Sequence, residues 1–211
     1  MKTHNVNYYE ASQDFVPENT GWKRICQLIR AELLPNKKNW LGTIVSFLGG
    51  FIIAWIIGTA DGTVEMTNAA CTVFLELQIA VFGCVLTAYS ILLAFLDEKY
   101  MKILLHIGYK GKPNYLKAGT DYFEAVMYIY VVGIMVSLCT KLVVTCMPIN
   151  FLVSDCTMLN ESVAVVLLFV YLSFCIRTIY EIKSIVANTA TLFGGSLAFR
   201  IQKFATEIDE E

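Results

Sequence analysis

The sequence has little charge and few of the residues that usually build catalytic sites. Only 16% of its 211 residues are charged, against about 25% in a typical soluble domain, and 56% are hydrophobic. The two histidines, His4 and His106, are far apart, and no HExxH, CxxC, GxGxxG, GxSxG or Walker A motif occurs. The net charge of −2 provides no basic surplus for nucleic acid. These absences argue against an enzyme, a cofactor, a metal site and direct binding of nucleic acid.

Long hydrophobic runs dominate the sequence instead. A transmembrane helix needs about 20 predominantly apolar residues, and four segments reach this length, at about 40–60, 71–96, 122–147 and 163–182. Each is too long for a buried strand, and the strands of a membrane barrel would alternate in polarity. The sequence therefore predicts an all-α polytopic membrane protein, with four transmembrane helices and cytoplasmic amphipathic helices.

Lysine and arginine are distributed unevenly between the parts of the chain outside these runs. The connections 61–70 and 148–161 contain neither residue, whereas positive charges cluster before the first span, between the second and third, and around the end of the fourth. Positive charges favour the cytoplasmic side of a membrane. We therefore expect a multi-pass protein of the cell inner (plasma) membrane with both termini in the cytoplasm.

The cytoplasmic parts are predicted to be an N-terminal segment, 1–39, and a helical C-terminal tail, 183–211, on either side of a bundle at 40–182. The N-terminal segment contains an amphipathic helix at 22–34, which is expected to lie on the inner leaflet or, alternatively, to dock a cytosolic partner. The predicted lipid or partner surface comprises Lys23, Arg24, Arg30, Lys102, Lys110 and Lys112.

Two further cytoplasmic helices are expected from the pattern of apolar residues. The first is a short amphipathic helix at 99–108 in the middle connection, ended by Gly108. The second follows the fourth span, and we expect the sequence FGGS at 193–196 to interrupt the tail there. The tail would then consist of two separate helical stretches.

Small residues recur at every fourth position of the first span, which predicts one face suited to close helix packing. Such a face lets two helix backbones approach closely in lipid. The predicted packing face comprises Gly42, Ser46, Gly50, Ala54 and Gly58. It could pack within one subunit or between subunits.

The middle spans carry polar stripes. In the second span Glu76, Ala80, Gly83, Thr87 and Ser90 recur in steps of four and three, typical of a seam that faces a neighbouring helix. In the third span the stripe is Gly133, Ser137, Lys141 and Thr145. These patterns favour a bundle with a partly polar interior or an assembly around a pore.

Charges inside the spans are expected to find partners. Glu76 and Lys141 both lie roughly 7–9 Å below the outer end of their spans at 1.5 Å per residue, which predicts an intramembrane ion pair within or between subunits. The alternative is that Lys141 reaches the outer headgroups. Arg177 and Glu181 are one helical turn apart and are predicted to pair at the inner interface.

Three cysteines, Cys71, Cys146 and Cys156, are predicted to cluster near the outer face. A disulfide between Cys146 and Cys156, or between Cys71 and Cys156, would tie the outer connections together in an oxidising exterior.

The layout resembles that of the small four-span membrane proteins of bacterial anti-phage defence loci, in particular the KwaA-type subunit of the Kiwa system. The resemblance rests on cytoplasmic termini, short outer connections and the basic connection LDEKYMKILLHIGYKGKPNYLKAG, and it covers nearly the whole chain through layout, without a specific motif. It implies an oligomeric membrane sensor of phage infection, coupled to a cytosolic DNA-binding effector subunit. It carries over no functional residues.

From these observations we expect a non-enzymatic sensor or scaffold in antiviral defence that contacts the lipid bilayer. It would form a homo-oligomer and couple a membrane event to a cytosolic effector partner, with no cofactor. The alternative is a small oligomeric ion channel, pore or transporter subunit, with Glu76 and Lys141 lining the path.

Overall fold

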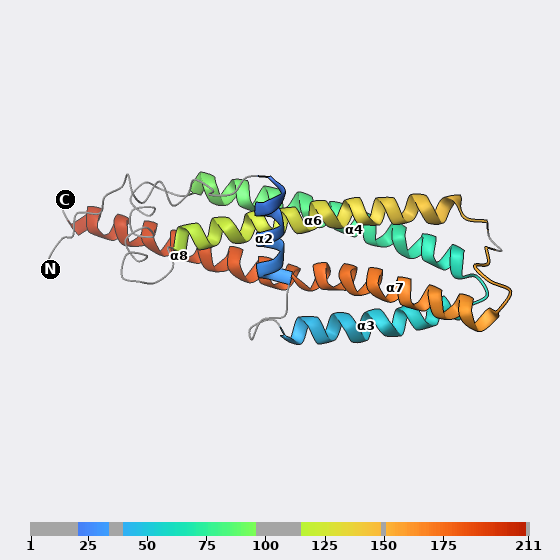
Figure 1. The fold of residues 1–211 in the computed structure, drawn as a ribbon. Helices are drawn as coiled ribbons and strands as arrows, with labels where there is room; N and C mark the ends of the chain where they lie inside the picture. The colour runs from blue at the N-terminus through green and yellow to red at the C-terminus, as the bar shows by residue number, and fades with distance from the viewer. Residues whose placement is uncertain (1–20, 34–39, 96–114, 149–150, 210–211) are drawn as a thin grey trace. The chain divides into compact units, whose positions relative to one another are not determined.

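The computed structural model is all-helical over the residues that it describes, which are 21–33, 40–95, 115–148 and 151–209 (Figure 1). Their helices are α2 (Trp22–Leu33), α3 (Trp40–Gly58), α4 (Thr63–Phe95), α6 (Tyr115–Cys146), α7 (Thr157–Tyr180) and α8 (Ile182–Asp209). Four candidate membrane spans occur, at Trp40–Gly58, Thr63–Ile91, Gly119–Cys146 and Thr157–Ala198. The protein is therefore an all-α, multi-pass membrane protein, as its composition predicts.

The helices of the second, third and fourth spans begin earlier than the hydrophobic runs do. α4 begins at Thr63 instead of 71. The Met66 amide donates to the Gly62 carbonyl at 2.9 Å, and in the turn before the helix the Thr63 hydroxyl donates to the Ala60 carbonyl at 2.7 Å. Much of the predicted outer connection at 61–70 is therefore helix. Polar residues in the first turns of a helix can face water, so hydropathy alone does not mark where such a helix begins.

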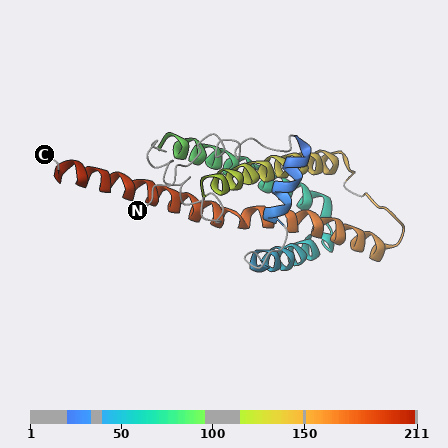
Figure 2. The same cartoon turned by 60° about the vertical axis from the view of Figure 1, so that its left-hand side comes forward.

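The C-terminal helix α8 runs unbroken from Ile182 to Asp209 (Figure 2). The predicted interruption at 193–196 is therefore wrong. Two glycines inside a helix cost about 2 kcal/mol relative to alanine, and the remaining turns of a 28-residue helix offset that cost. The other predicted cytoplasmic helix, at 99–108, lies outside the described residues.

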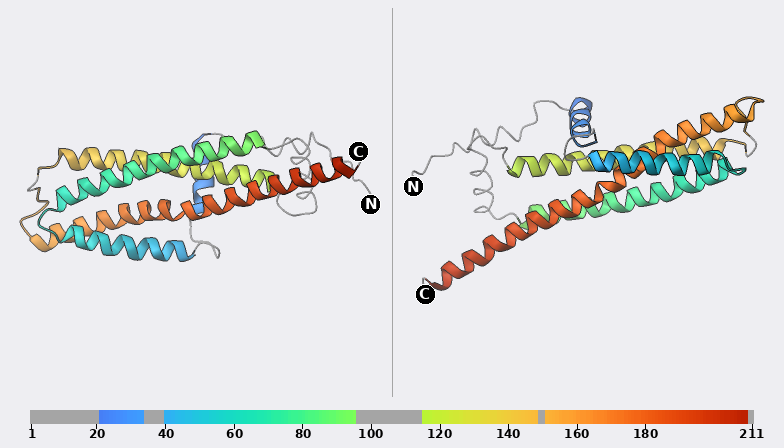
Figure 3. Two further views of the ribbon diagram at one scale, coloured as in Figure 1. Left: turned by 180° about the vertical axis from the view of Figure 1, so that it is seen from behind. Right: turned by 90° about the horizontal axis from the view of Figure 1, so that it is seen from below.

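The chain forms two compact units, each with its own packing. One consists of residues 1–32, 85–126 and 185–211, and the other of residues 33–84 and 127–184. In the first unit, α2 lies against the first part of α6 and runs across it (Figure 3), and the rings of Tyr89 and Phe123 lie 5.5 Å apart. The second unit contains α3, α7, residues 63–84 of α4 and residues 127–146 of α6.

In the second unit, α3 lies along α7 through its face of small residues (Figures 1 and 3). All five residues of this face, Gly42, Ser46, Gly50, Ala54 and Gly58, are buried. A Cβ atom at Gly50 would lie 2.8 Å from the Ser173 backbone nitrogen, and one at Gly58 would lie 3.1 Å from the Val165 nitrogen. The face therefore packs inside the chain, and the backbones of α3 and α7 touch because nothing larger than hydrogen projects there.

We expect Gly50→Ala to lower the free energy of unfolding by roughly 1–3 kcal/mol, because the added methyl group meets rigid backbone. Gly49→Ala is the matched control, since a Cβ atom there meets only the flexible end of Ile176 at 3.4 Å. Unfolding of both variants in detergent micelles measures the difference. Equal stability of the two variants would contradict the close contact between α3 and α7.

Candidate functional site

A cluster of hydrogen-bonded polar side chains lies inside the second unit, at the junction of α4, α6 and α7. The Ser137 hydroxyl of α6 donates to Gln78 Oε1 of α4 at 2.9 Å, and the Tyr171 hydroxyl of α7 donates to Ser137 Oγ at 3.1 Å. Gln78 Nε2 lies 3.8 Å from the Cys175 sulfur. Gln78, Ser137 and Cys175 are fully buried. We call these four residues the core polar cluster.

The core polar cluster depends on a glycine for its space. Gly133 lies one turn before Ser137 on α6, and a Cβ atom there would approach Gln78 Nε2 to 3.0 Å. An amide buried in an apolar medium is costly unless it is hydrogen-bonded. The cluster thus joins three helices through bonds that would be lost if any of them moved. Gln78 was not among the predicted site residues, although a glutamine inside a hydrophobic run is the signal for such a contact.

A buried ion pair lies where α7 ends. Arg177 Nη1 donates to Glu181 Oε1, and the two side chains are only 7% and 2% exposed. Beside them the Tyr130 hydroxyl of α6 donates to the Thr178 carbonyl at 2.9 Å. The sequence predicted this pair at the membrane interface, but α3, α6 and α7 enclose it. The burial of this ion pair depends on how the helices pack. The i,i+4 spacing of Arg177 and Glu181 predicts their contact but not their burial.

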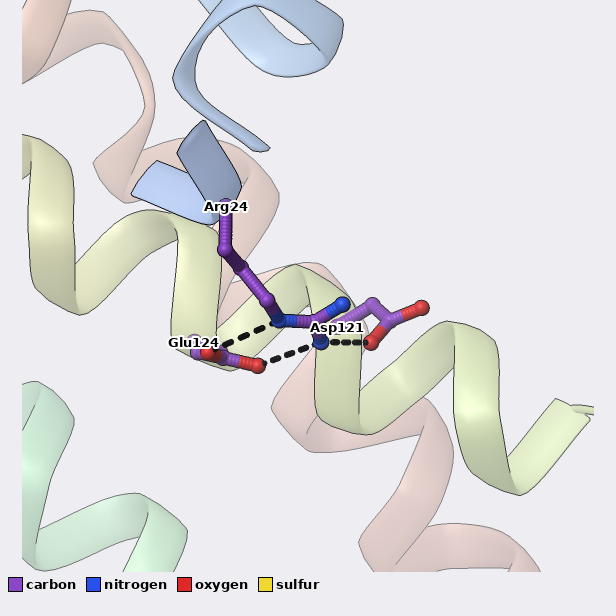
Figure 4. Close-up of polar contacts among 3 residues, drawn as sticks. All are labelled: Arg24, Asp121 and Glu124. Carbon is purple, nitrogen blue, oxygen red and sulfur yellow. Dashed lines mark hydrogen bonds and ion pairs between the residues drawn. The ribbon is translucent and has the colours of Figure 1, made fainter. Parts of the chain in front are cut away.

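A third polar site lies in the first unit, where one arginine of α2 binds two carboxylates of α6 (Figure 4). Arg24 Nε donates to Glu124 Oε1 at 3.2 Å, and Nη2 donates to Glu124 Oε2 and to Asp121 Oδ1, each at 2.7 Å. The hydrogen bond and charge of Glu124, together with those of Asp121, raise the pKa of the Arg24 guanidinium, so it stays charged. We call this arrangement the Arg24 clasp.

The Arg24 clasp changes the interpretation of the predicted basic surface. Lys23 and Arg30 are exposed, but Arg24 is turned toward α6 and is not part of an open surface. Lys102, Lys110 and Lys112 lie outside the described residues. Asp121 and Glu124 are three residues apart on one helix face, and this spacing was the signal in the sequence for a partner arginine.

Glu76 and Lys141 do not meet within one chain. Among the residues that the structure describes, no ion pair joins them. Lys141 is half-buried near the Cys71 thiol, whereas Glu76 is exposed. Five residues of helix rotate Glu76 about 140° away from Cys71. The prediction of a pair within one subunit is therefore wrong, because equal depth in a membrane does not make two side chains face each other.

The whole stripe that contains Glu76 points outward. Glu76, Ala80, Gly83, Thr87 and Ser90 are all exposed, and α4 buries Cys71, Gln78 and Val85 on its opposite face. The stripe on α6 is divided, since Gly133 and Ser137 are buried but Thr145 is exposed. The stripe on α4 is thus not part of the interior of a single chain.

The three cysteines that were predicted to lie near the outer face are free thiols in the structure. Cys71 is fully buried in the hydrophobic core with Leu172 and Cys175, whereas Cys146 and Cys156 are exposed. Cys71 is thus enclosed in the bundle and does not pair with Cys156, and Cys146 is not bonded to Cys156 either. Within the described ranges, no three His, Cys, Asp or Glu side chains are grouped as metal ligands.

We expect Ser137→Ala to lower the free energy of unfolding by roughly 1–2 kcal/mol, because the change removes bonds to both Gln78 and Tyr171. Thr140→Ala is the control on the same helix, since the Thr140 hydroxyl bonds only to its own helix, at the Val136 carbonyl. It should change stability by less than about 0.5 kcal/mol. Unfolding in micelles compares the two, and an equal effect would argue against the core polar cluster as an interhelical contact.

We expect Arg177→Gln and Glu181→Gln each to destabilise the bundle by roughly 3–5 kcal/mol, because each removes one of the two opposite charges of a buried ion pair. The double variant should be more stable than either single variant, since two neutral amides can hydrogen-bond to each other. A double-mutant cycle in micelles measures this recovery. Strictly additive losses would show that the two charges do not interact.

Comparison with known proteins does not assign a function to these three sites. No family model, no curated protein sequence and no solved structure matches the chain. The roles of the core polar cluster, the buried ion pair and the Arg24 clasp therefore rest on their own chemistry.

Proposed function

We propose that the protein is a non-enzymatic membrane sensor or scaffold that couples an event in the bilayer to a cytosolic effector partner. The observation that carries this proposal is the Arg24 clasp. It joins an amphipathic helix outside the hydrophobic spans to the end of a spanning helix by three charge-assisted hydrogen bonds. A contact of this kind can transmit a movement of α6 to α2.

The other contacts of α2 are few, which supports the proposal that α2 can be released from the rest of the chain. Ile25, Leu28 and Ile29 are half-buried against the chain, so α2 is held by a small apolar contact and the clasp. Charge-assisted hydrogen bonds at partly exposed sites are individually modest. A shift of the first part of α6 would therefore free α2, and its apolar face could then enter a groove on a partner.

The cellular setting rests on the sequence. The distribution of lysine and arginine supports cytoplasmic termini, which places α2 on the side of a cytosolic effector. The layout resemblance supports a homo-oligomeric component of bacterial anti-phage defence in the inner membrane. The stimulus would then be a disturbance of that membrane during infection.

The exposed stripe of α4 favours a second function, an oligomeric channel, pore or transporter subunit. A carboxylate that faces lipid costs up to roughly 3 kcal/mol at the centre of a span on insertion scales, and Glu76 is exposed in the single chain. Water in a pore between copies would remove that cost. Conduction by the purified protein alone, with selectivity changed by Glu76→Gln, would favour this function over the sensor.

We expect Arg24→Gln to loosen α2, because it removes the charge that both carboxylates bind. The lost stability is about 1–2 kcal/mol after allowance for partial exposure, so amide hydrogen exchange at 22–33 should become roughly 5- to 30-fold faster. Arg30→Gln is the matched control, since this arginine of the same helix is exposed and takes no part in the clasp. Exchange is measured by mass spectrometry on protein reconstituted in nanodiscs of phosphatidylcholine alone, where Arg30 meets no anionic headgroups.

The same two variants test the coupling in cells. Placed in the intact locus and challenged with phage, Arg24→Gln should lose protection or become toxic without infection. Arg30→Gln, which leaves the clasp intact, should keep protection and should not be toxic. Membrane levels of both variants must equal that of the parent protein. Normal protection by Arg24→Gln, despite faster exchange in α2, would reject the clasp as the coupling element.

A further inference from the structure

The helix α2 presents to the outside a face that is basic and aromatic. Trp22, Lys23, Cys26, Gln27 and Arg30 are exposed, whereas Arg24, Ile25, Leu28 and Ile29 are half-buried. At 100° per residue the two sets occupy opposite sides of the helix. The sequence predicted that the apolar side would enter the leaflet, but that side covers the protein instead. We call the exposed set the outer face of α2.

The Arg24 clasp fixes the position along the α6 axis at which α2 lies. Asp121 and Glu124 are the last charged residues before the uncharged run 125–140 of the third span. Their bonds to Arg24 therefore hold α2 at the polar boundary of that span, where lipid headgroups lie. This contact keeps α2 beside the headgroup layer.

The direction of α2 agrees with this level. The helix runs across the first part of α6 and not along it (Figures 1 and 3). A helix that crosses a membrane-spanning helix in this way lies along the membrane plane. Its outer face is therefore turned sideways, toward the lipid that surrounds the protein, and not along the span toward the cytosol.

We propose that the outer face of α2 binds the headgroups of anionic phospholipids in the adjacent leaflet. Lys23 and Arg30 supply the positive charge, and no carboxylate occurs from Trp22 to Arg30. Trp22 is 75% exposed, and tryptophan prefers the headgroup level. Each basic residue near an anionic membrane strengthens the association roughly fivefold, so the two together contribute roughly 30-fold. This inference goes beyond the proposed function, because it needs no effector partner.

Fluorescence of Trp22 in nanodiscs tests the proposal. The chain has three tryptophans, so Trp40→Phe and Trp55→Phe leave Trp22 as the only tryptophan, which is excited selectively at wavelengths that tyrosine does not absorb. Compared with nanodiscs of phosphatidylcholine alone, nanodiscs with about one third phosphatidylglycerol should shift Trp22 emission to shorter wavelength and lower acrylamide quenching roughly threefold. The added double change Lys23→Gln and Arg30→Gln should abolish the difference. Lys183→Gln, which alters an exposed lysine outside α2, should preserve it.

A second measurement avoids the tryptophan substitutions. The phospholipids that copurify with the otherwise unchanged protein should contain less phosphatidylglycerol after the double change in α2, but not after Lys183→Gln. The proposal is overturned if Trp22 responds equally in both kinds of nanodisc, or if the double change alters neither readout. It is also overturned if concentrated salt leaves the response intact, because headgroup binding is electrostatic. None of these outcomes bears on effector coupling, which the Arg24 variants test separately.

Discussion

The hydrocarbon core of a membrane offers no water, so every polar group that the chain places there must find its partner within the protein. Helices satisfy the backbone, and hydroxyl groups such as those of Ser46 and Thr140 bond to the carbonyl one turn earlier in their own helix. Gln78 cannot do this alone and bonds to α6 instead. The core polar cluster and the buried ion pair follow from this one constraint, and they join helices that hydrophobic contact alone would leave free to slide.

Close backbone packing makes these polar contacts possible. The small face of α3 lets α7 approach until backbone touches backbone, and α7 is the helix that carries Tyr171, Cys175 and Arg177. Gly133 has the corresponding effect beside Gln78 on α6. In lipid, where burial of apolar surface gives little advantage, such contacts and the hydrogen bonds they permit provide most of the cohesion between helices. Small residues therefore matter as much as polar ones in positioning the site.

Sequence patterns predicted well wherever the controlling interaction is local. The four spans follow from the length of the hydrophobic runs, and the contact between Arg177 and Glu181 follows from their spacing of one turn. The prediction for Glu76 and Lys141 failed within one chain because depth, which the sequence supplies, leaves rotation about the helix axis undetermined. The amphipathic pattern of α2 was also visible in the sequence. The sequence did not show whether the apolar side of this helix would cover protein or enter lipid.

The sequence by itself determined that this is an all-helical membrane protein with four spans, because hydrophobicity and helical hydrogen bonding act along the chain, residue by residue. It also determined that one face of α3 admits close contact. Only the tertiary structure decided that this face meets α7, that Gln78 meets Ser137, and that Arg24 reaches Asp121 and Glu124. These pairings depend on how several helices rotate and pack together, and each rotation is chosen by the sum of contacts on all sides, which no pattern within a single helix contains.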